Sequence, residues 1–369
     1  TEVRSLVSFP ADVSYQHVLV IPAFMESAQF IERFIDSTLV QQQCLLIVVV
    51  NQPNSDFGRQ HQQAQGDLST RITQQGNLLW QQDNLRLIDL THAKSNKTAN
   101  SAILLVDRYS KPIPTEQGVG LARKIGADLA VKLFFEGNIL SSWVHSSDAD
   151  AHLPDNYLTA HVTNNLTLKT AVATCCNLYA QSPYAYFTIG SILSFDIKAY
   201  CQARGFPKRS AGEDFYLLNK LAKLGKVAYL PDVTIKLDAR PSQRVPFGTG
   251  PAVQSIMQLT EQGQDYLYYH PEVFIALKHC LHAFDNLWQD RQQPNIWLAR
   301  LPEKTQQALT NIGLLTFITK QKSAQKIQFD KQLTVWFDSF KTLKFIHALR
   351  DLGFQNIALE QAIADAPFS

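Results

Sequence analysis

Trp-Val-His-Ser-Ser-Asp-Ala-Asp-Ala-His-Leu-Pro, residues 143–154, is the stretch around which the chain is organised, because a short apolar segment runs directly into two carboxylates. In extended chain, side chains two residues apart point to the same side, so Asp148 and Asp150 can converge on one cation. Oxygen ligands favour Mg²⁺ or Mn²⁺, and water and substrate phosphates complete the shell. The stretch therefore predicts a strand that ends in a metal site for a diphosphate-bearing substrate. A polar turn that caps the next helix is the simpler alternative.

The composition is that of a globular protein without a polyanion-binding character. The 369 residues carry a formal net charge of +2, with 45% hydrophobic and 18% charged residues. No long Lys/Arg run is present, so nucleic acid is not an expected partner. Five cysteines without a Cys-x-x-Cys pair argue against zinc and predict buried thiols. No apolar run reaches about 18 residues, so we expect no transmembrane segment and a cytoplasmic location, free or peripheral to a membrane.

The first part of the chain predicts an α/β fold. Residues 17–24 and 45–50 are continuous apolar runs too short for helices, and apolar residues recur at helical spacing over 30–39 between them. Strand, helix, strand in this order is typical of a parallel βαβ unit. Residues 57–84 predict a helix with a mobile portion, and residues 85–90 a third strand. We expect a Rossmann-like, mostly parallel sheet flanked by helices, with ligand loops at the carboxyl ends of its strands.

The middle of the chain is less regular. Residues 91–117 show a weak pattern and predict a long irregular connection. Glycines at 118 and 120 then lead into a predicted helix that ends near residue 135. A helix start that carries Arg123 could host phosphate, with a water-facing basic side chain as the alternative. Further strands are predicted at residues 171–180 and 226–230.

Two later features also carry charged side chains suited to a site. Glu213 and Asp214 stand in the first turn of an amphipathic helix, where acidic residues complement the helix dipole. The functional alternative is that one of them is a general base toward an acceptor hydroxyl. Arg240 and Arg244 belong to a glycine-containing loop that could close over a diphosphate or an anionic acceptor, or form a surface connection.

The last part of the chain predicts a separate helical domain. Residues 255–369 contain apolar residues spaced for single helix faces, at 274–284 and again at 337–349. Such stripes predict a packed core rather than an acceptor groove. We therefore divide the chain into a catalytic domain, residues 1–254, and a helical accessory domain, residues 255–369.

The order of these motifs resembles the GT-A nucleotide-sugar glycosyltransferases, and more narrowly glycosyltransferase family 2. The shared features are an apolar strand with Pro22 and Glu26, a second strand ending in a turn, a glycine-led helix with Arg123, Asp-x-Asp, Leu-Pro-x-x-Tyr-Leu, Gly-Phe and Glu-Asp. The resemblance covers about residues 15–250. Each motif is short, and the specificity lies in their order and spacing.

The resemblance implies roles for individual residues. Asp148 and Asp150 would hold the ribose and the metal, Mg²⁺ or Mn²⁺, and Asp214 of the Glu213–Asp214 pair would be the base of an inverting enzyme. The residues expected to bind the donor lie at strand ends and in loops: Pro22, Glu26, Asn51, Arg123, Asp148, Arg240 and Arg244.

This sequence departs from the family pattern in three places. The connection over residues 91–117 is longer than is usual in the family. Asn51 stands where the family has an aspartate for the nucleoside base, so an amide or Asp56 would take that hydrogen bond. No histidine lies between His161 and His270, so the late histidine metal ligand of some relatives is absent, and Asp238 is a candidate replacement.

The resemblance implies a hexosyltransferase-type enzyme that moves a sugar from a UDP- or GDP-sugar to an acceptor hydroxyl. The donor sugar, the acceptor and the stereochemistry are open. One alternative is a sugar nucleotidyltransferase, which would need a glycine-rich basic signature that residues 23–26 do not supply. The other is a catalytically degenerate module that only binds a nucleotide sugar, against which Asp148, Asp150 and Asp214 count.

Overall fold

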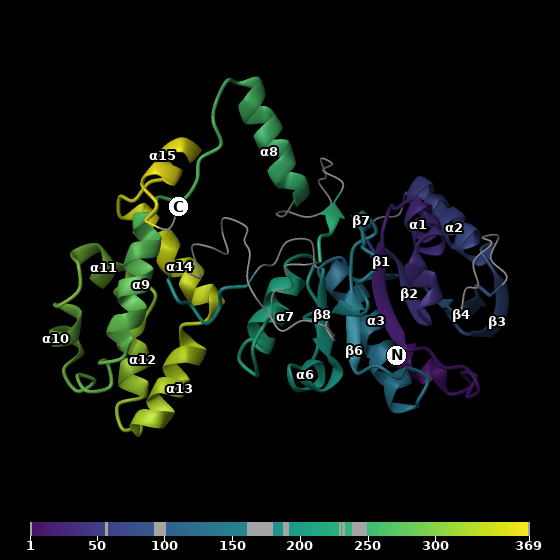
Figure 1. The fold of residues 1–369 in the computed structure, drawn as a ribbon, viewed down its shortest axis with the longest axis horizontal. Helices are drawn as coiled ribbons and strands as arrows, with labels where there is room; N and C mark the ends of the chain where they lie inside the picture. Colours follow the sequence, from purple (N-terminus) through teal and green to yellow (C-terminus); the bar gives the residue numbers. More distant parts are fainter. Residues whose placement is uncertain are drawn as a thin grey trace. The chain divides into compact units, whose positions relative to one another are not determined.

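The structure is a computed structural model, and it divides into two compact units (Figure 1). The residues it describes are 2–55, 58–91, 101–160, 180–186, 192–228, 230, 233–237 and 249–367. The first unit comprises Thr1–Thr167, Thr188–Leu224 and Leu230–Gln254, and the second Leu168–Phe187, Gly225–Tyr229 and Ser255–Ser369. The first unit is α/β, and the second is helical.

The first unit is built on a seven-stranded sheet in the order β3-β4-β5-β2-β1-β6-β8. Its four central strands are parallel: β1 (His17–Ala23), β2 (Cys44–Pro53), β5 (Ala102–Ile113) and β6 (Trp143–Ser146). The outer strands are antiparallel: β3 (Asn77–Gln82), β4 (Leu85–Asp89) and β8 (Leu193–Asp196). A second, two-stranded sheet pairs β7 (Ala151–His152) with β9 (Lys236–Leu237). The predicted α/β class with a mostly parallel sheet is confirmed.

Helices cover both faces of the large sheet (Figure 1). Val18 and Val20 of β1 pack with α3 (Gly118–Phe135) in one core. Leu19 of β1 packs in a second core with α1 (Gln29–Asp36) and α2 (Arg59–Thr73). Because successive side chains of a strand face opposite sides, a strand buried on both faces has a continuous apolar sequence. This is why β1 and β2 could be predicted.

Gly126 marks the closest approach of α3 to the sheet. A Cβ at this position would lie 2.3 Å from Val20 Cγ1 and 3.4 Å from Val49 Cγ2. Gly126→Ala is therefore expected to lower the free energy of unfolding by about 1–3 kcal/mol, because the core there is already filled. The matched control is Gly66→Ala in α2, where nothing lies within 4 Å of the added Cβ, and alanine should stabilise the helix by about 0.5–1 kcal/mol. Urea unfolding measures both, and equal effects would contradict the close approach.

The structure corrects the predicted irregular connection at residues 91–117. Residues 102–113 of this stretch form β5, which lies beside β2 in the sheet. Residues 102–106 are buried, but residues 107–112 are only partly buried or exposed. Because the second half of the strand is polar and contains a proline, the apolar first half was not recognised as part of a long strand. The predicted helix at residues 57–84 is also only partly right, because α2 is followed by β3, an exposed edge strand without buried periodicity.

The strand predicted at residues 226–230 is not formed, since residues 226–228 and 230 have no regular secondary structure. Residues 171–179 of the other predicted strand lie outside the described residues. The helix predicted from residue 118 is confirmed, and so is the helix that begins at Glu213, α7 (Glu213–Leu221). It is preceded by α6 (Ile197–Gln202).

The second unit contains the predicted helices and their core. Its helices are α9 (Glu272–Phe284), α10 (Pro294–Leu298), α11 (Glu303–Asn311), α12 (Leu314–Lys320), α13 (Lys326–Trp336), α14 (Ser339–Asp351) and α15 (Leu359–Ala364). Phe274 and Leu277 of α9 pack with Phe345 and Leu349 of α14, which confirms both apolar stripes as core. Leu343 was predicted on the same face, but it is 40% exposed. The unit thus has its own hydrophobic core.

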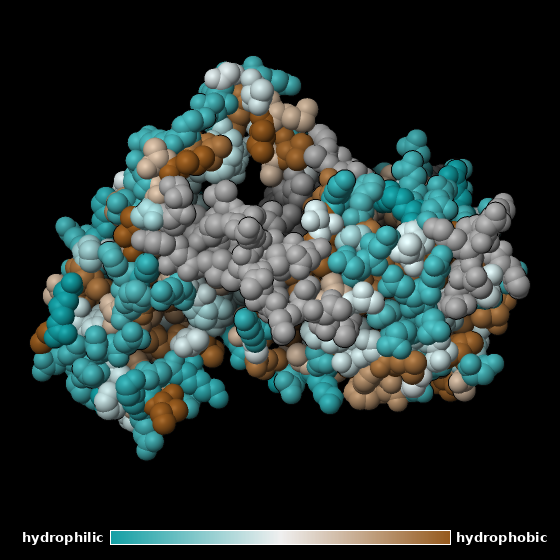
Figure 2. All heavy atoms as spheres, in the orientation of Figure 1, coloured by the Kyte–Doolittle hydropathy of each residue, from teal (hydrophilic) through white to brown (hydrophobic). Residues whose placement is uncertain are grey.

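Helix α8 (Thr249–Glu261) spans the division between the two units. It carries apolar side chains on the surface (Figure 2), including Ile256 and Met257, which are 44% and 49% exposed.

In the part of the chain that the structure describes, no helix combines the length and apolar character needed to cross a bilayer. Cys44 and Cys280 are buried as predicted, but Cys201 is exposed.

Candidate functional site

The order of strands reverses between β1 and β6. The parallel strands are added outward from β1 through β2 to β5, and β6 then returns to the other side of β1. In open α/β sheets, ligands bind outside the carboxyl ends of the strands at such a reversal. Residues 24–26 follow β1 and residues 147–150 follow β6. The topology therefore places Glu26, Asp148 and Asp150 at the edge of the sheet where a ligand site is expected.

Pro22 ends the pairing of β1 with β6. The two strands are in register from Val18 to Val20, and Ser147 donates its N–H to Val20 O at 3.1 Å. Alternate residues of a strand in a parallel sheet face the same neighbour, so Pro22 faces the β6 side as Val20 does. Proline has no N–H to donate. The pairing of β1 with β6 therefore stops just before the candidate ligand edge.

Arg123 of α3 is the centre of the site, and its side chain is 1% exposed. Its Nε donates to Glu213 Oε1 at 2.7 Å, its Nη1 donates to Ser146 Oγ at 2.9 Å and Ser147 O at 3.0 Å, and its Nη2 pairs with Asp148 Oδ1. Burial alone would lower the pKa of Arg123, but the two carboxylates raise it above the ordinary value. The Arg123 network thus joins α3, the end of β6 and the start of α7.

Asp148 follows β6 as the sequence predicted, and its side chain is 33% exposed. Partial burial raises the pKa of Asp148 to about 6, with the nearby charges of Asp150 and Glu213 adding to the rise and Arg123 opposing it. Between the two aspartates, Ala149 O accepts a hydrogen bond from Arg33 Nη2 of α1 at 2.6 Å. The loop that carries both carboxylates is therefore tied to α1 and to α3.

These aspartates are the candidate cation ligands. Two neighbouring carboxylates fit a hard divalent cation whose shell is completed by water and phosphate oxygens. The described residues hold no group of three His, Cys, Asp or Glu side chains that could form a complete protein site. Any cation held here would therefore need ligands in addition to Asp148 and Asp150.

The start of α7 supplies the two other predicted acids, and they differ in surroundings. Glu213 is 3% exposed and is held by Arg123, so its carboxylate is committed to the Arg123 network. Asp214 is only partly buried, and its Oδ1 accepts the N–H of Phe215 at 2.7 Å. Its charge also acts on Arg123. Of the two, Asp214 is the more exposed acid.

The glycines before Arg123 do not face a ligand. Gly120 donates its N–H to Arg209 O at 2.9 Å, and a Cβ on Gly120 would lie 2.5 Å from Pro207 O. A Cβ on Gly118 would lie 2.7 Å from Ser210 Cα. The glycines therefore allow the segment 207–210 to lie against the start of α3. The predicted close approach is real, but it is made by the chain's own backbone rather than by phosphate.

Gln65 is a site residue that the sequence did not indicate. It is fully buried in α2, and its Nε2 donates to Asn51 O at 2.5 Å and to Ala23 O at 3.3 Å, while its Oε1 accepts the N–H of Met25 at 3.2 Å. Met25 is in the left-handed region, with φ 56°. Gln65 thus ties the loop after β1 to the carboxyl end of β2. A glutamine in a Gln-rich segment gives no signal of this role.

Asn51 lies at the carboxyl end of β2 and is 4% exposed. Its side-chain Oδ1 is buried and has no hydrogen-bond partner among the described residues. A buried acceptor without a donor is costly, so a ligand N–H would be favoured there. Glu26 is partly buried in the loop after β1.

The remaining predicted site residues are Arg240 and Arg244, together with the candidate substitutes Asp56 and Asp238. All four lie outside the described residues. Comparison of the chain with known protein families and with curated proteins gave no match. The chemistry of the site therefore has to be argued from its own residues.

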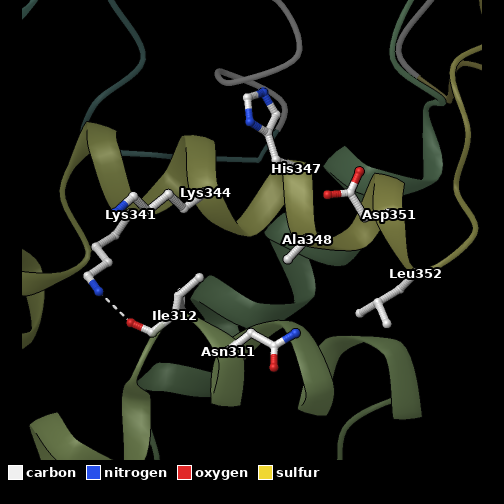
Figure 3. Close-up of a pocket in the computed structure, with 8 residues that line it drawn as sticks. All are labelled: Asn311, Ile312, Lys341, Lys344, His347, Ala348, Asp351 and Leu352. Atoms are coloured by element: carbon white, nitrogen blue, oxygen red, sulfur yellow. Dashed lines mark hydrogen bonds between the residues drawn. The ribbon is translucent and has the colours of Figure 1, made fainter.

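A groove of about 390 Å³ lies in the second unit, between α11 and α14 (Figure 3). It is lined by Asn311, Ile312, Lys341, Lys344, His347, Ala348, Asp351 and Leu352. Lys341 Nζ donates to Ile312 O, and His347 Nε2 lies 2.8 Å from Tyr269 Oη. Burial and the charge of Arg350 lower the pKa of His347. With Asp351 as its one acid, this groove offers no carboxylate pair for a cation.

Proposed function

We propose that this chain is a metal-dependent glycosyltransferase with a GT-A fold, which moves a sugar with inversion from a UDP- or GDP-sugar to an acceptor hydroxyl. The observation that carries the proposal is the Arg123 network. It brings the end of β6, with Asp148, together with the start of α7, with Asp214. These are the residues to which the resemblance to glycosyltransferase family 2 assigns the metal, the ribose and the base.

In this proposal Arg123 is a positioning residue. It is buried and binds two carboxylates, the hydroxyl oxygen of Ser146 and the backbone oxygen of Ser147. We therefore assign it to orienting Asp148 rather than to contacting the donor. Asp148 is bound to Arg123 through Oδ1, and we assign its Oδ2 to the ribose and the cation. Asp150 is its partner in holding Mg²⁺ or Mn²⁺. The cation supplies charge neutralisation for the departing nucleoside diphosphate.

Other residues hold the donor and activate the acceptor. Asn51 Oδ1 accepts an N–H of the nucleoside base. This oxygen is suited to the role because it is buried and accepts no hydrogen bond from the described residues. Pro22 and Glu26 border the nucleoside. Asp214 takes the proton of the acceptor hydroxyl as the new glycosidic bond forms, the role of a general base. Glu213 holds Arg123 in place.

The sugar nucleotidyltransferase alternative is less well supported. Such an enzyme needs a flexible glycine-rich and basic loop after its first strand to receive a triphosphate. Here the loop after β1 contains Met25 and Glu26, without glycine or a cation, and Gln65 holds it in place. The degenerate binding module is distinguished from the transferase by experiment.

Thermal shift with nucleoside diphosphates and nucleotide sugars, each with and without Mn²⁺, tests donor binding. At about 100 times the Kd, binding should stabilise the protein by about 2.7 kcal/mol and raise Tm by about 5 °C. The Mn²⁺-dependent part of the shift should be lost in Asp150→Ala. Asp12→Ala, which removes an exposed carboxylate elsewhere, should keep it. A shift that is equal in both variants would contradict the proposed site, and binding without sugar turnover would favour the degenerate module.

A further inference from the structure

Three basic residues belong to the turn that ends α6 in the first unit or to the helices beside it. They are Arg204 in the turn itself, Lys124 of α3 and Lys220 of α7. Lys220 Nζ donates to Gly205 O at 3.3 Å. A Cβ on Gly205 would lie 3.0 Å from Lys124 Nζ. Burial lowers the pKa of Lys220, and the positive charges of Lys124 and Arg204 lower it further. Lys124 and Lys220 thus both reach Gly205, and Arg204 is the residue directly before it. We call these three side chains the α6 basic cluster.

Only one of the three cations of the cluster has an acidic partner among the described residues. Lys124 pairs with Asp128 at 2.9 Å, and the same carboxylate accepts the hydroxyl of Tyr200 at 3.0 Å. Across the residues that the structure describes, neither Arg204 nor Lys220 forms an ion pair. Two positive charges are thus held beside a third without a carboxylate of their own.

The surrounding segment has the same imbalance. Residues 192–224 contain six basic side chains and three acidic ones. The acids are all engaged elsewhere: Asp196 caps α6, Glu213 binds Arg123 and Asp214 belongs to the candidate site. None of the three offsets the α6 basic cluster.

The backbone at Arg204 is strained. Its φ is 60°, in the left-handed region, and Gly205 follows with φ 68°. Residues other than glycine, asparagine and aspartate rarely adopt this conformation, because Cβ approaches the following carbonyl oxygen. Asparagine or glycine at this position would adopt the same backbone conformation with less strain. Strain of this kind is typical of positions kept for a function.

We propose that the α6 basic cluster binds a phosphate group of a ligand. A guanidinium presents a planar fork to two phosphate oxygens, and an ammonium adds a compact charge. A phosphate dianion between Arg204 and Lys220 would turn the repulsion within the cluster into attraction. The site is distinct from the Arg123 network and needs neither a divalent cation nor a nucleotide. Its test is therefore independent of the proposed transferase activity.

Isothermal titration of the whole chain with inorganic phosphate, in EDTA and at low salt, tests the site. Arg204→Asn and Lys220→Met should each weaken binding about tenfold, the loss typical of a charged hydrogen bond. Lys198→Ala removes an exposed cation from the same helix α6 and should leave the affinity within about twofold. Arg204→Asn should also raise Tm, because asparagine tolerates the left-handed region, so loss of binding there cannot result from unfolding. Undiminished binding in both cluster variants, or an equal loss in Lys198→Ala, would overturn the proposal.

The source of the phosphate is resolved by two further probes. Glycerol 3-phosphate that binds more tightly than inorganic phosphate, with dependence on Arg204, supports the site and indicates a soluble phosphorylated ligand. Sedimentation with vesicles of phosphatidylglycerol, but not with phosphatidylcholine alone, and its loss in Arg204→Asn supports the site and indicates a lipid headgroup. Failure of inorganic phosphate, glycerol 3-phosphate and vesicles alike to bind overturns it.

Discussion

Arg123→Ala is expected to lower the free energy of unfolding by about 3–5 kcal/mol, the cost of removing one partner from a buried ion pair. The substitution leaves Glu213, which is 3% exposed, without its cation, and also removes the donor to Ser146 Oγ. Buried carboxylates cannot be rehydrated without opening the site. Urea unfolding at pH 7 in EDTA measures the loss.

A matched control separates this effect from the loss of any positive charge on α3. Lys132 pairs with Glu136 on the same helix, but the side chain is 40% exposed, so Lys132→Ala should cost less than about 0.5 kcal/mol. Combining Arg123→Met with Glu213→Gln should cost less than the sum of the single changes, because the two groups interact directly. Similar losses of unfolding free energy in Lys132→Ala and Arg123→Ala would contradict the large contribution that we assign to the buried Arg123 network.

The deficit of Arg123→Ala should also depend on pH. The pKa of Asp148 is raised to about 6, above the ordinary value of about 3.9, so the fold favours its protonated form. Its contribution to stability is then complete below about pH 4 and is lost as pH rises through about 6. Without Arg123, which opposes the rise, the folded pKa moves higher still. The deficit should therefore be smaller at pH 5 than at pH 7.

Asp214→Asn is expected to lower the rate of sugar transfer by about 10²–10⁴-fold, the contribution of a general base. The amide has nearly the same shape but cannot take the proton of the acceptor. Donor affinity should stay within about threefold, because Asp214 is not assigned to the donor. Single-turnover release of nucleoside diphosphate measures the rate, and thermal shift measures the affinity.

Glu213→Gln distinguishes the two neighbouring acids. Glu213 is buried on Arg123, so this change should destabilise the fold, whereas the partly buried Asp214 should tolerate an amide. Asp12→Asn, at an exposed acid far along the chain, should alter neither property. A full transfer rate in Asp214→Asn would exclude this residue as the base and would require another proton acceptor.

The sheet could be predicted where burial on both faces leaves an uninterrupted apolar run, as in β1 and β2. It could not be predicted at β5, because residues 107–112 are partly buried or exposed, and their polar sequence does not show the pattern of a buried strand. It also could not be predicted at β3, whose residues are nearly all exposed at the sheet edge. Periodicity reports burial, so a strand that is half-exposed or at an edge leaves little trace.

The candidate site shows the same limit. The spacing of Asp148 and Asp150 indicated a shared direction, and Arg123 was expected near the same ligand. The sequence did not reveal that Arg123 and Glu213, 90 residues apart, form a buried pair. Nor did it reveal Gln65, since a buried contact with backbone carbonyls depends on the packing of α2 and not on neighbouring residues.

Gln65 has a consequence for how the molecule moves. One carboxamide bonds the carbonyl of Ala23, the carbonyl of Asn51 and the N–H of Met25, so the loop after β1 cannot move away from the end of β2 without breaking these bonds. Local opening of a protein proceeds in cooperative units. A molecule that orders the loop after β1 will therefore also hold the end of β2, and amide exchange in both segments should slow together.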